Sequence, residues 1–163
     1  MSRILRLALA VVASTSCARP EVAPLTDADR AAVADSVTAG MRAYEEAIKA
    51  KDVQRVLGLY GDSAQFRLID NETVVSYAAL RSMLPQLFGS LRSYGGGFGS
   101  IHVNVLSRDV ALADAPYVDI LTDTAGAVTR IRGAVTWVWL RGPRGWRIIH
   151  GQAYGTPDTT ARR

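Results

Sequence analysis

The chain has 163 residues, of which 48% are hydrophobic and 21% charged, and its formal net charge is +4. This composition fits one globular domain and excludes a chain kept disordered by high charge and low hydrophobicity. Nucleic-acid binding is also not expected, because such proteins gather basic residues on one face. Four arginines lie near the two ends of the chain, and removing them takes the formal charge from +4 to 0: Arg3, Arg6, Arg162 and Arg163.

The first sixteen residues have the order of a secretory signal segment. Arg3 and Arg6 precede the apolar stretch Leu7–Ala13, and small residues follow it up to Cys17. The apolar stretch is too short to cross a bilayer as a helix of the mature protein. We therefore predict that residues 1–16 are a signal segment and that the chain is exported.

Cys17 is the only cysteine, so it has no partner for an internal disulfide bond. Its position directly after small residues resembles the lipobox of bacterial lipoproteins, although Ser14 stands where that family prefers leucine. The resemblance implies that Cys17 is diacylated and anchors the protein to a membrane of the bacterial cell envelope. Residues 17–25, which contain two prolines, would then form an extended tether. A secreted or periplasmic protein and an uncleaved leader are the alternatives.

Three amphipathic helices are predicted in the first half of a domain that we place at residues 26–155. Thr26 is the expected N-cap of the first helix, which carries acidic residues in its first turn and apolar residues at three- and four-residue steps. Asp52 is expected to cap a second, short helix. Ser76 is expected to cap a third, which Pro85 should kink or split.

Most of the remaining domain alternates between apolar and polar residues, as β-strands do. Short strands are expected around Phe66 and at Thr73–Val75, whereas three consecutive glycines predict a flexible loop at Tyr94–Gly99. The domain closes with a hairpin of Val128–Leu140 and Trp146–Tyr154, and residues 156–163 are expected to be a disordered tail. Helices followed by strands predict an α+β fold, with an antiparallel sheet covered on one face.

The register of the closing hairpin decides which of its side chains are buried. A four-residue loop at positions 142–145 would pair Trp139 with Ile148 and Trp137 with His150, and directly opposed residues share a face. A slip of one residue would turn the second strand's side chains outward. Without a slip, the predicted residues on the buried face of the two tryptophans are His150, Gln152 and Tyr154.

Two stretches, within residues 44–66 and residues 135–150, resemble the opening and the closing hairpin of SnoaL-like domains in the nuclear-transport-factor-2-like superfamily. The similarity spans nearly all of residues 26–155. It implies a cone-shaped, strongly bent antiparallel sheet of about six strands packed on three N-terminal helices. It also implies a pocket between sheet and helices and a homodimer through the sheet face. Members include ketosteroid isomerases, polyketide cyclases and dehydratases, and many domains without an assigned activity, so the fold does not give the function.

An isomerase or cyclase of this fold needs a carboxylate or histidine base that faces a hydrogen-bond donor. His150 and Asp119 are the candidate acid/base residues. The structural alternatives are a partly buried, hydrogen-bonded His150 and a solvated Asp119. The residues expected to line the pocket are Tyr44, Tyr60, Phe66, Tyr117, Trp137, Trp139, Trp146, Gln152 and Tyr154.

Neither a metal nor a cofactor is expected, because the chain has only two histidines and its glycine run lacks the lysine of a phosphate-binding loop. Two hypotheses remain. The first is an exported envelope domain whose pocket binds a small apolar or amphipathic ligand, or a protein partner, without catalysis. The second is an isomerase, cyclase or hydratase that uses His150 or Asp119.

Overall fold

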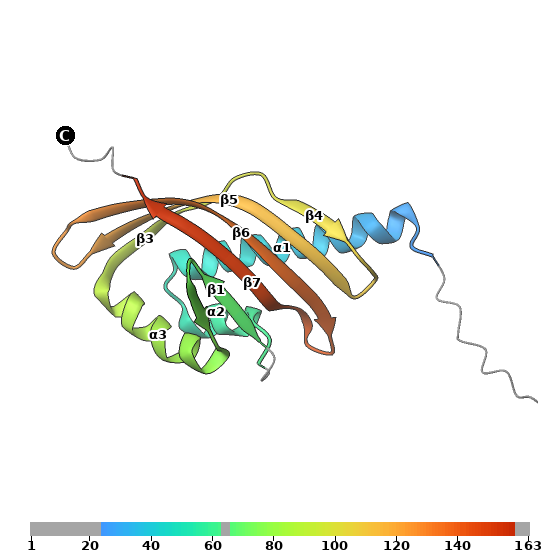
Figure 1. The fold of residues 1–163 in the computed structure, drawn as a ribbon, viewed down its shortest axis with the longest axis horizontal. Coiled ribbons are helices and arrows are strands. Elements are labelled where there is room, and N and C mark those ends of the chain that lie inside the picture. The colour runs from blue at the N-terminus through green and yellow to red at the C-terminus, as the bar shows by residue number, and fades with distance from the viewer. Residues whose placement is uncertain (1–23, 63–65, 159–163) are drawn as a thin grey trace, which may run out of the picture.

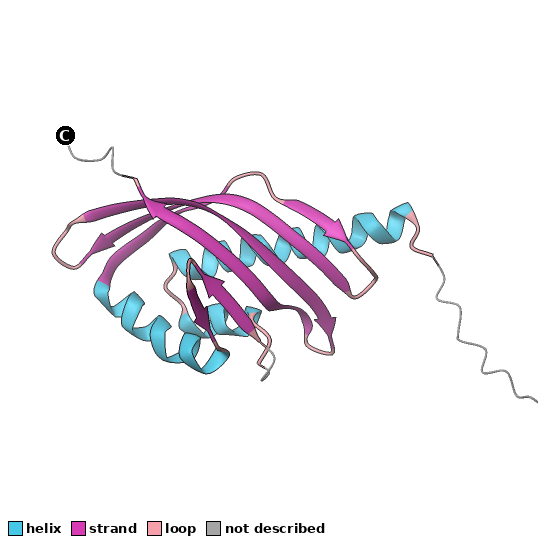
Figure 2. Cartoon of the chain, in the orientation of Figure 1, coloured by secondary structure: helices cyan, strands magenta, loops and turns pink. Residues whose placement is uncertain are grey.

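The computed structural model describes residues 24–62 and 66–158, so the predicted signal segment and Cys17 lie outside the described residues. In the described part, three helices pack on one bent sheet of seven strands (Figures 1 and 2). The helices are α1 (Asp27–Lys49), α2 (Val53–Leu59) and α3 (Tyr77–Ser90). The strands are β1 (Arg67–Asp70), β2 (Thr73–Val75), β3 (Leu91–Phe98), β4 (His102–Val105), β5 (Val110–Asp123), β6 (Val128–Gly142) and β7 (Gly145–Pro157). Within these residues, no helix has the length and apolarity needed to span a bilayer.

Each helix begins where a polar side chain satisfies backbone N–H groups that have no partner inside the helix. Thr26 accepts a hydrogen bond from the backbone of Asp29, and the Asp29 carboxylate accepts one from the backbone of Thr26, which completes a capping box. Asp52 and Ser76 accept in the same way at the starts of α2 and α3. The predicted starts of all three helices are therefore confirmed.

The flexible loop predicted at Tyr94–Gly99 is wrong, because most of this stretch belongs to strand β3. Gly96 and Gly97 have φ values of +94° and +148°, which other residues rarely adopt. A side chain at Gly96 would overlap the carbonyl oxygen of Val118 on β5. The glycines thus allow β3 to lie close against β5, and this extra strand raises the sheet from the expected six strands to seven.

The order of strands in the sheet is β2-β1-β7-β6-β5-β3, and β4 pairs with the other end of β5. Strand β1 runs parallel to β7, with Leu68 opposite Gly151, so the sheet is mixed rather than wholly antiparallel as predicted. Strand β7 continues to Pro157, which pairs with Ile131. The domain therefore extends beyond the predicted end at residue 155, and the rest of the predicted tail, residues 159–163, lies outside the described residues.

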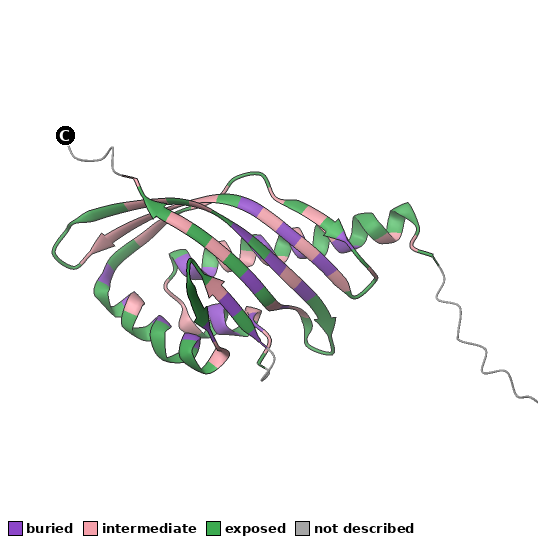
Figure 3. Cartoon of the chain, viewed as in Figure 1, coloured by how far each residue is buried: buried purple, intermediate pink, exposed green. Residues whose placement is uncertain are grey.

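The core lies between the concave face of the sheet and α1, where buried positions alternate with intermediate ones along β5 and with intermediate or exposed ones along β6 (Figure 3). Trp137 and Trp139 are 2% and 0% exposed, so the prediction that the tryptophan side of β6 is the buried side is confirmed. The indole of Trp139 lies directly against Gly40 of α1, where a Cβ atom would be 2.9 Å from the ring. Gly40 therefore makes room for the largest side chain of the core.

The predicted register of the β6–β7 hairpin is correct only as far as Ile148. Trp139 pairs with Ile148, but the neighbouring Val138 pairs with His150, because Ile149 is an extra residue in β7. Such a β-bulge reverses the faces of all residues that follow it. The prediction was therefore wrong for three side chains, which all face outward and are exposed: His150, Gln152 and Tyr154.

Candidate functional site

A cavity of about 180 Å³ lies between the concave face of the sheet and helices α1 and α3. Strand β5 contributes Tyr117 and Asp119 to it, because these residues continue the inward-facing series of Ala111, Ala113 and Ala115. Most of the remaining wall is apolar or aromatic. Its apolar members include Ile48, Leu68, Leu80, Leu84, Leu87 and Val135.

Asp119 is a half-buried carboxyl group in this apolar surrounding. Burial raises the pKa of Asp119 above its ordinary value of 3.8, and a hydrogen bond from the hydroxyl of Tyr94 opposes the rise without cancelling it. Burial and the neighbouring Asp119 carboxylate raise the pKa of Tyr94 far above its ordinary value. The cavity thus holds a carboxyl group that takes up protons more readily than usual, next to a phenol that stays neutral.

Tyr44 and Tyr60 form a second polar pair in the cavity wall. The hydroxyl of Tyr60 donates to the hydroxyl of Tyr44 over 3.3 Å. Burial raises the pKa of Tyr44 to about 12 and that of Tyr60 well above its ordinary value, so both phenols are neutral at physiological pH. Because Tyr60 supplies the proton of this hydrogen bond, the hydroxyl proton of Tyr44 remains available to a molecule in the cavity.

Tyr117 lies across two glycines on the neighbouring strands. It pairs with Gly133 of β6, which pairs in turn with Gly155 of β7. A Cβ atom would be 2.7 Å from the Tyr117 ring at Gly133 and 3.2 Å from it at Gly155. The missing side chains let the ring lie flat on the sheet. Burial, followed by the nearby charge of Asp119, raises the pKa of Tyr117 to about 12, so it is a third neutral hydroxyl beside the carboxyl group.

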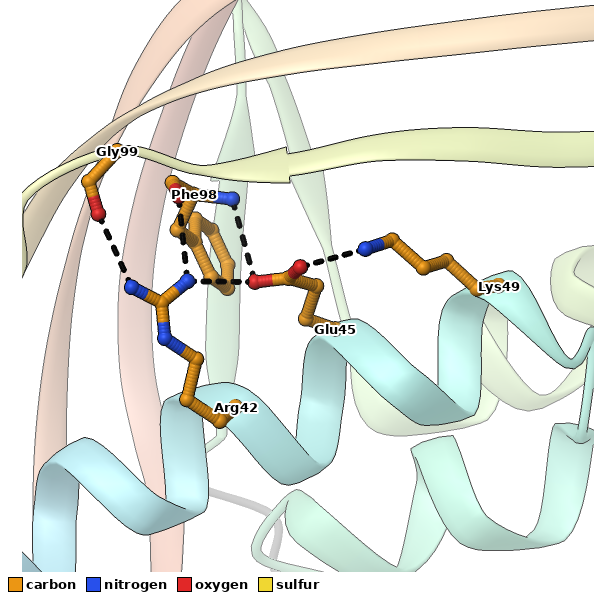
Figure 4. Close-up of polar contacts among 5 residues, drawn as sticks. All are labelled: Arg42, Glu45, Lys49, Phe98 and Gly99. Carbon is orange, nitrogen blue, oxygen red and sulfur yellow. Dashed lines mark hydrogen bonds and ion pairs between the residues drawn. The ribbon is translucent and has the colours of Figure 1, made fainter.

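Glu45 of α1 links this helix to β3 through a hydrogen bond at the wall of the cavity (Figure 4). Its carboxylate accepts hydrogen bonds from Arg42 at 2.7 Å, Lys49 at 2.6 Å and the backbone of Phe98 at 3.4 Å. Burial alone would raise the pKa of Glu45, but these three donors together lower it below the ordinary value of 4.5. Gly97 allows the contact, because a Cβ atom there would overlap the carboxylate.

We expect Glu45→Gln to destabilise the domain by about 1 kcal/mol at pH 7, because the neutral amide loses two charge-assisted hydrogen bonds. A carboxylate with a lowered folded-state pKa stabilises the fold above its unfolded-state pKa, and this contribution is lost as the pH falls through the folded-state pKa. The difference between wild type and variant should therefore shrink below about pH 4.5 in urea unfolding. Glu46→Gln is the matched control, since its side chain is 72% exposed and that of Glu45 only 16%. An equal loss in both variants would contradict this role of Glu45.

The profile of the SnoaL-like domain matches residues 37–153, which include every residue that borders the cavity. The chain belongs to the SnoaL-like domain family. Its architecture is the nuclear-transport-factor-2-like cone that the sequence predicted. No curated protein matches the chain.

Several solved structures share the fold. A nuclear-transport-factor-2-like protein from Salmonella enterica is 18% identical, with a TM-score of 0.71 over 82% of this chain and 98% of that one. A conserved protein from Planctomyces limnophilus is 16% identical, with a TM-score of 0.66 over 82% and 100%. The hexachlorocyclohexane dehydrochlorinase LinA-type3 from Novosphingobium barchaimii is 10% identical, with a TM-score of 0.67 over 83% and 96%. At these identities the likeness shows the fold alone.

The predicted pocket residues of this SnoaL-like domain separate into three groups. Asp119 lies in the cavity together with Tyr44, Tyr60, Tyr117 and Trp137. Phe66 and Trp139 are fully buried in the core and do not border the cavity. Trp146 of β7 lines a different hollow, next to the first turns of α1. The bulge at Ile149 turns the remaining three predicted residues outward: His150, Gln152 and Tyr154.

Tyr94, Glu45 and Lys49 border the cavity but were not predicted as site residues. The spacing of Arg42, Glu45 and Lys49 on a helix does predict ion pairs. The spacing does not reveal that β3 lies against these three side chains, because the sequence predicted a loop at Tyr94–Gly99 where β3 is found. Among the described residues, no group of three or more histidine, cysteine, aspartate or glutamate side chains is placed to hold a metal ion.

Proposed function

We propose that this SnoaL-like domain binds a small, mainly apolar cyclic molecule that carries a hydroxyl or keto group. The observation behind this is the position of Asp119, a proton-accepting carboxyl group in a cavity that is otherwise walled largely by aromatic and aliphatic side chains. Aromatic rings come from several elements, with Tyr44 and Trp137 4.7 Å apart in an edge-to-face contact. Such walls favour flat ring systems through burial and ring contacts.

The polar groups define what the ligand's functional group must be. A carboxylate has about four acceptor positions, and Tyr94 occupies one on Asp119, so further positions can accept a ligand hydroxyl. Tyr44 and Tyr117 can donate to a ligand oxygen. An anionic ligand group would be repelled by Asp119, because like charges in a partly dry site are costly. A neutral hydroxyl or carbonyl group is therefore favoured.

A pair of probes that differ by one hydroxyl group tests this proposal. We expect 2-naphthol to bind wild-type protein roughly tenfold or more tightly than naphthalene, because its hydroxyl donates to a charged acceptor. Fluorescence titration measures both affinities. Asp119→Ala should remove most of the preference, whereas Gln152→Ala, on the outer face, should keep it. Equal binding of both probes by wild type, or an unchanged preference in Asp119→Ala, would contradict the proposed role of the cavity.

The raised pKa of Asp119 favours a second candidate function, which is proton transfer. In this reaction the Asp119 carboxylate takes a proton from the carbon next to a ligand carbonyl, and the electron pair of the C–H bond moves to the carbonyl oxygen. A hydrogen bond from Tyr44 would stabilise the resulting enolate. Where the ligand also carries a C=C bond next to the carbon that loses the proton, return of the proton to the far carbon of that bond shifts the double bond and completes an isomerisation. His150 takes no part in this scheme, because it faces outward.

Hydrogen exchange into a cyclic ketone tests the second candidate. Wild-type protein should speed the incorporation of deuterium from heavy water into 2-tetralone, followed by nuclear magnetic resonance. Asp119→Asn should abolish this acceleration, because an amide is not a base at neutral pH, and His150→Ala should leave it intact. If wild-type protein gives no acceleration while 2-naphthol still binds, the site binds ligands without catalysis.

Export, a diacyl anchor on Cys17 and a homodimer through the outer face of the sheet also belong to this proposal. The outer face carries apolar side chains that no described element covers, including the 60% exposed Tyr154. Native mass spectrometry of the membrane-extracted protein would report the acyl chains, the oligomeric state and any ligand that copurifies. Cys17→Ser should remove the acyl mass and leave the dimer and the ligand in place.

A further inference from the structure

We propose that the end of the domain at which α1 begins docks directly on an anionic phospholipid membrane. We define this α1 end as residues 24–30, the β4–β5 turn at 106–109 and the β6–β7 hairpin at 140–147. The proposal goes beyond the acyl anchor, because it assigns membrane contact to the folded domain itself.

The three segments of the α1 end are held together by direct contacts, and Figure 1 shows them at the same end of the molecule. Arg108 in the β4–β5 turn forms an ion pair with Asp29 of α1 at 2.8 Å. The backbone of Arg141 in the hairpin donates to the carbonyl oxygen of Asp109 over 2.8 Å. The α1 end is therefore one continuous surface on a fixed scaffold.

This surface is basic, whereas the described chain as a whole is neutral. Residues 24–62 and 66–158 carry fourteen lysines and arginines and fourteen aspartates and glutamates, yet the α1 end has five arginines and only three aspartates. Three of the five lie in one hairpin, at Arg141, Arg144 and Arg147. The exposed apolar side chains of Leu106 and Leu140, with 56% and 39% of their surface accessible, belong to the same end. Arginines beside exposed leucines are typical of a surface that lies in a lipid headgroup layer.

A hollow of about 170 Å³ between the α1 end and residues 32–36 of α1 provides a place for a headgroup phosphate. Arg108, Arg141 and Trp146 line it together with Ser36 of α1. Guanidinium groups bind phosphate oxygens through paired hydrogen bonds, and tryptophan favours the boundary between water and lipid. The Asp29 carboxylate also borders the hollow, but its ion pair with Arg108 offsets its charge.

The direction of the chain favours a membrane over other acidic partners. The described chain starts at Pro24, next to the first turn of α1, and Cys17 precedes it by seven residues. An extended segment of this length spans at most about 25 Å. An acyl anchor on Cys17 would thus hold the α1 end, and not the opposite end of the domain, against the lipid.

Vesicle binding by the chain from residue 17 with Cys17→Ser tests the surface without any acyl chain, so the result does not depend on the anchor. This chain keeps every described element, and circular dichroism verifies its fold. We expect it to bind vesicles of phosphatidylglycerol and phosphatidylcholine at low salt and to be released as salt rises. The triple variant Arg141→Gln, Arg144→Gln, Arg147→Gln should bind at least tenfold more weakly, since each arginine near the surface contributes about fivefold.

A matched triple variant carries the same change of charge away from the α1 end and should bind the vesicles as wild type does. Its substitutions lie on α2, α3 and β3: Arg55→Gln, Arg81→Gln and Arg92→Gln. Brominated lipids should quench Trp146, which is only partly buried, and Trp146→Phe should remove that quenching. Equal losses in the two triple variants would overturn the proposal. So would binding to soluble polyglutamate in preference to the vesicles, which would assign the α1 end to an acidic protein partner.

Discussion

Asp119→Asn should make the folded domain more stable at pH 7, raising its Tm by about 2–4 °C, while it weakens binding of 2-naphthol. The reason is that burial raises the pKa of Asp119, so its charged form opposes folding. An aspartate with a raised folded-state pKa binds more protons in the folded than in the unfolded state, and its penalty is fully present above the folded-state pKa. The gain from Asn should therefore be largest at neutral pH and disappear below the unfolded-state value of 3.8.

Asp114→Asn is the matched control for this prediction. Asp114 lies on the same strand, between the buried Ala113 and Ala115, and therefore projects from the opposite face of β5. Calorimetric scans of both variants between pH 4 and pH 8 compare the same chemical change inside and outside the cavity. A gain in the control equal to that in Asp119→Asn would show that the effect comes from net charge. A loss of stability in Asp119→Asn would mean that its contacts outweigh the cost of its charge.

Gly155→Ala should destabilise the domain by about 1–3 kcal/mol, because it forces a methyl group into space that Tyr117 occupies. The new Cβ atom would overlap the Tyr117 hydroxyl and lie 2.8 Å from Cγ2 of Ile131. To avoid this overlap, the Tyr117 side chain must move away from the sheet and into the cavity. We therefore expect weaker 2-naphthol binding together with the loss of stability, measured by fluorescence titration and urea unfolding.

A double-mutant cycle with Tyr117→Ala identifies the cause. If the Tyr117 ring is the obstacle, Gly155→Ala should cost little in a chain that already carries Tyr117→Ala. Gly142→Ala is the control, since Gly142 also lies in the β6–β7 hairpin but has no atom within 4 Å of an added Cβ. An undiminished cost of Gly155→Ala in the Tyr117→Ala background would place the strain at Ile131 or in the backbone instead.

The helices and the buried side of the sheet were predictable because their signals are local. Thr26, Asp52 and Ser76 are N-caps whose partners lie two or three residues away, so the sequence contains the whole interaction. The inward face of Trp137 and Trp139 follows from the two-residue period of one strand. Asp119 was a candidate on the same grounds, because it lies two residues after Tyr117 on one strand, but the sequence left a solvated position open.

The features that the sequence did not reveal depend on contacts between distant segments. A bulge at Ile149 adds one residue to a strand without a distinctive residue type, and it turns His150 away from the cavity. The glycine run at positions 95–97 indicates flexibility when taken alone. Its role in the fold becomes clear only from its neighbours in space, because Gly96 packs against Val118 of β5 and Gly97 packs against Glu45 of α1. The hydrogen bond between Tyr94 and Asp119 was missed for the same reason.

The place of β7 between β1 and β6 determines when the domain can fold during synthesis. Arg67 of β1 pairs with His150 of β7, which lies 83 positions later in the chain. The β1–β2 hairpin therefore has no strand of the main sheet to pair with until β7 has been synthesised. A nascent chain that stops before residue 145 can form helices but cannot close its core. Closure of the core therefore requires β7, the last strand to be synthesised among the described elements, and comes late in synthesis.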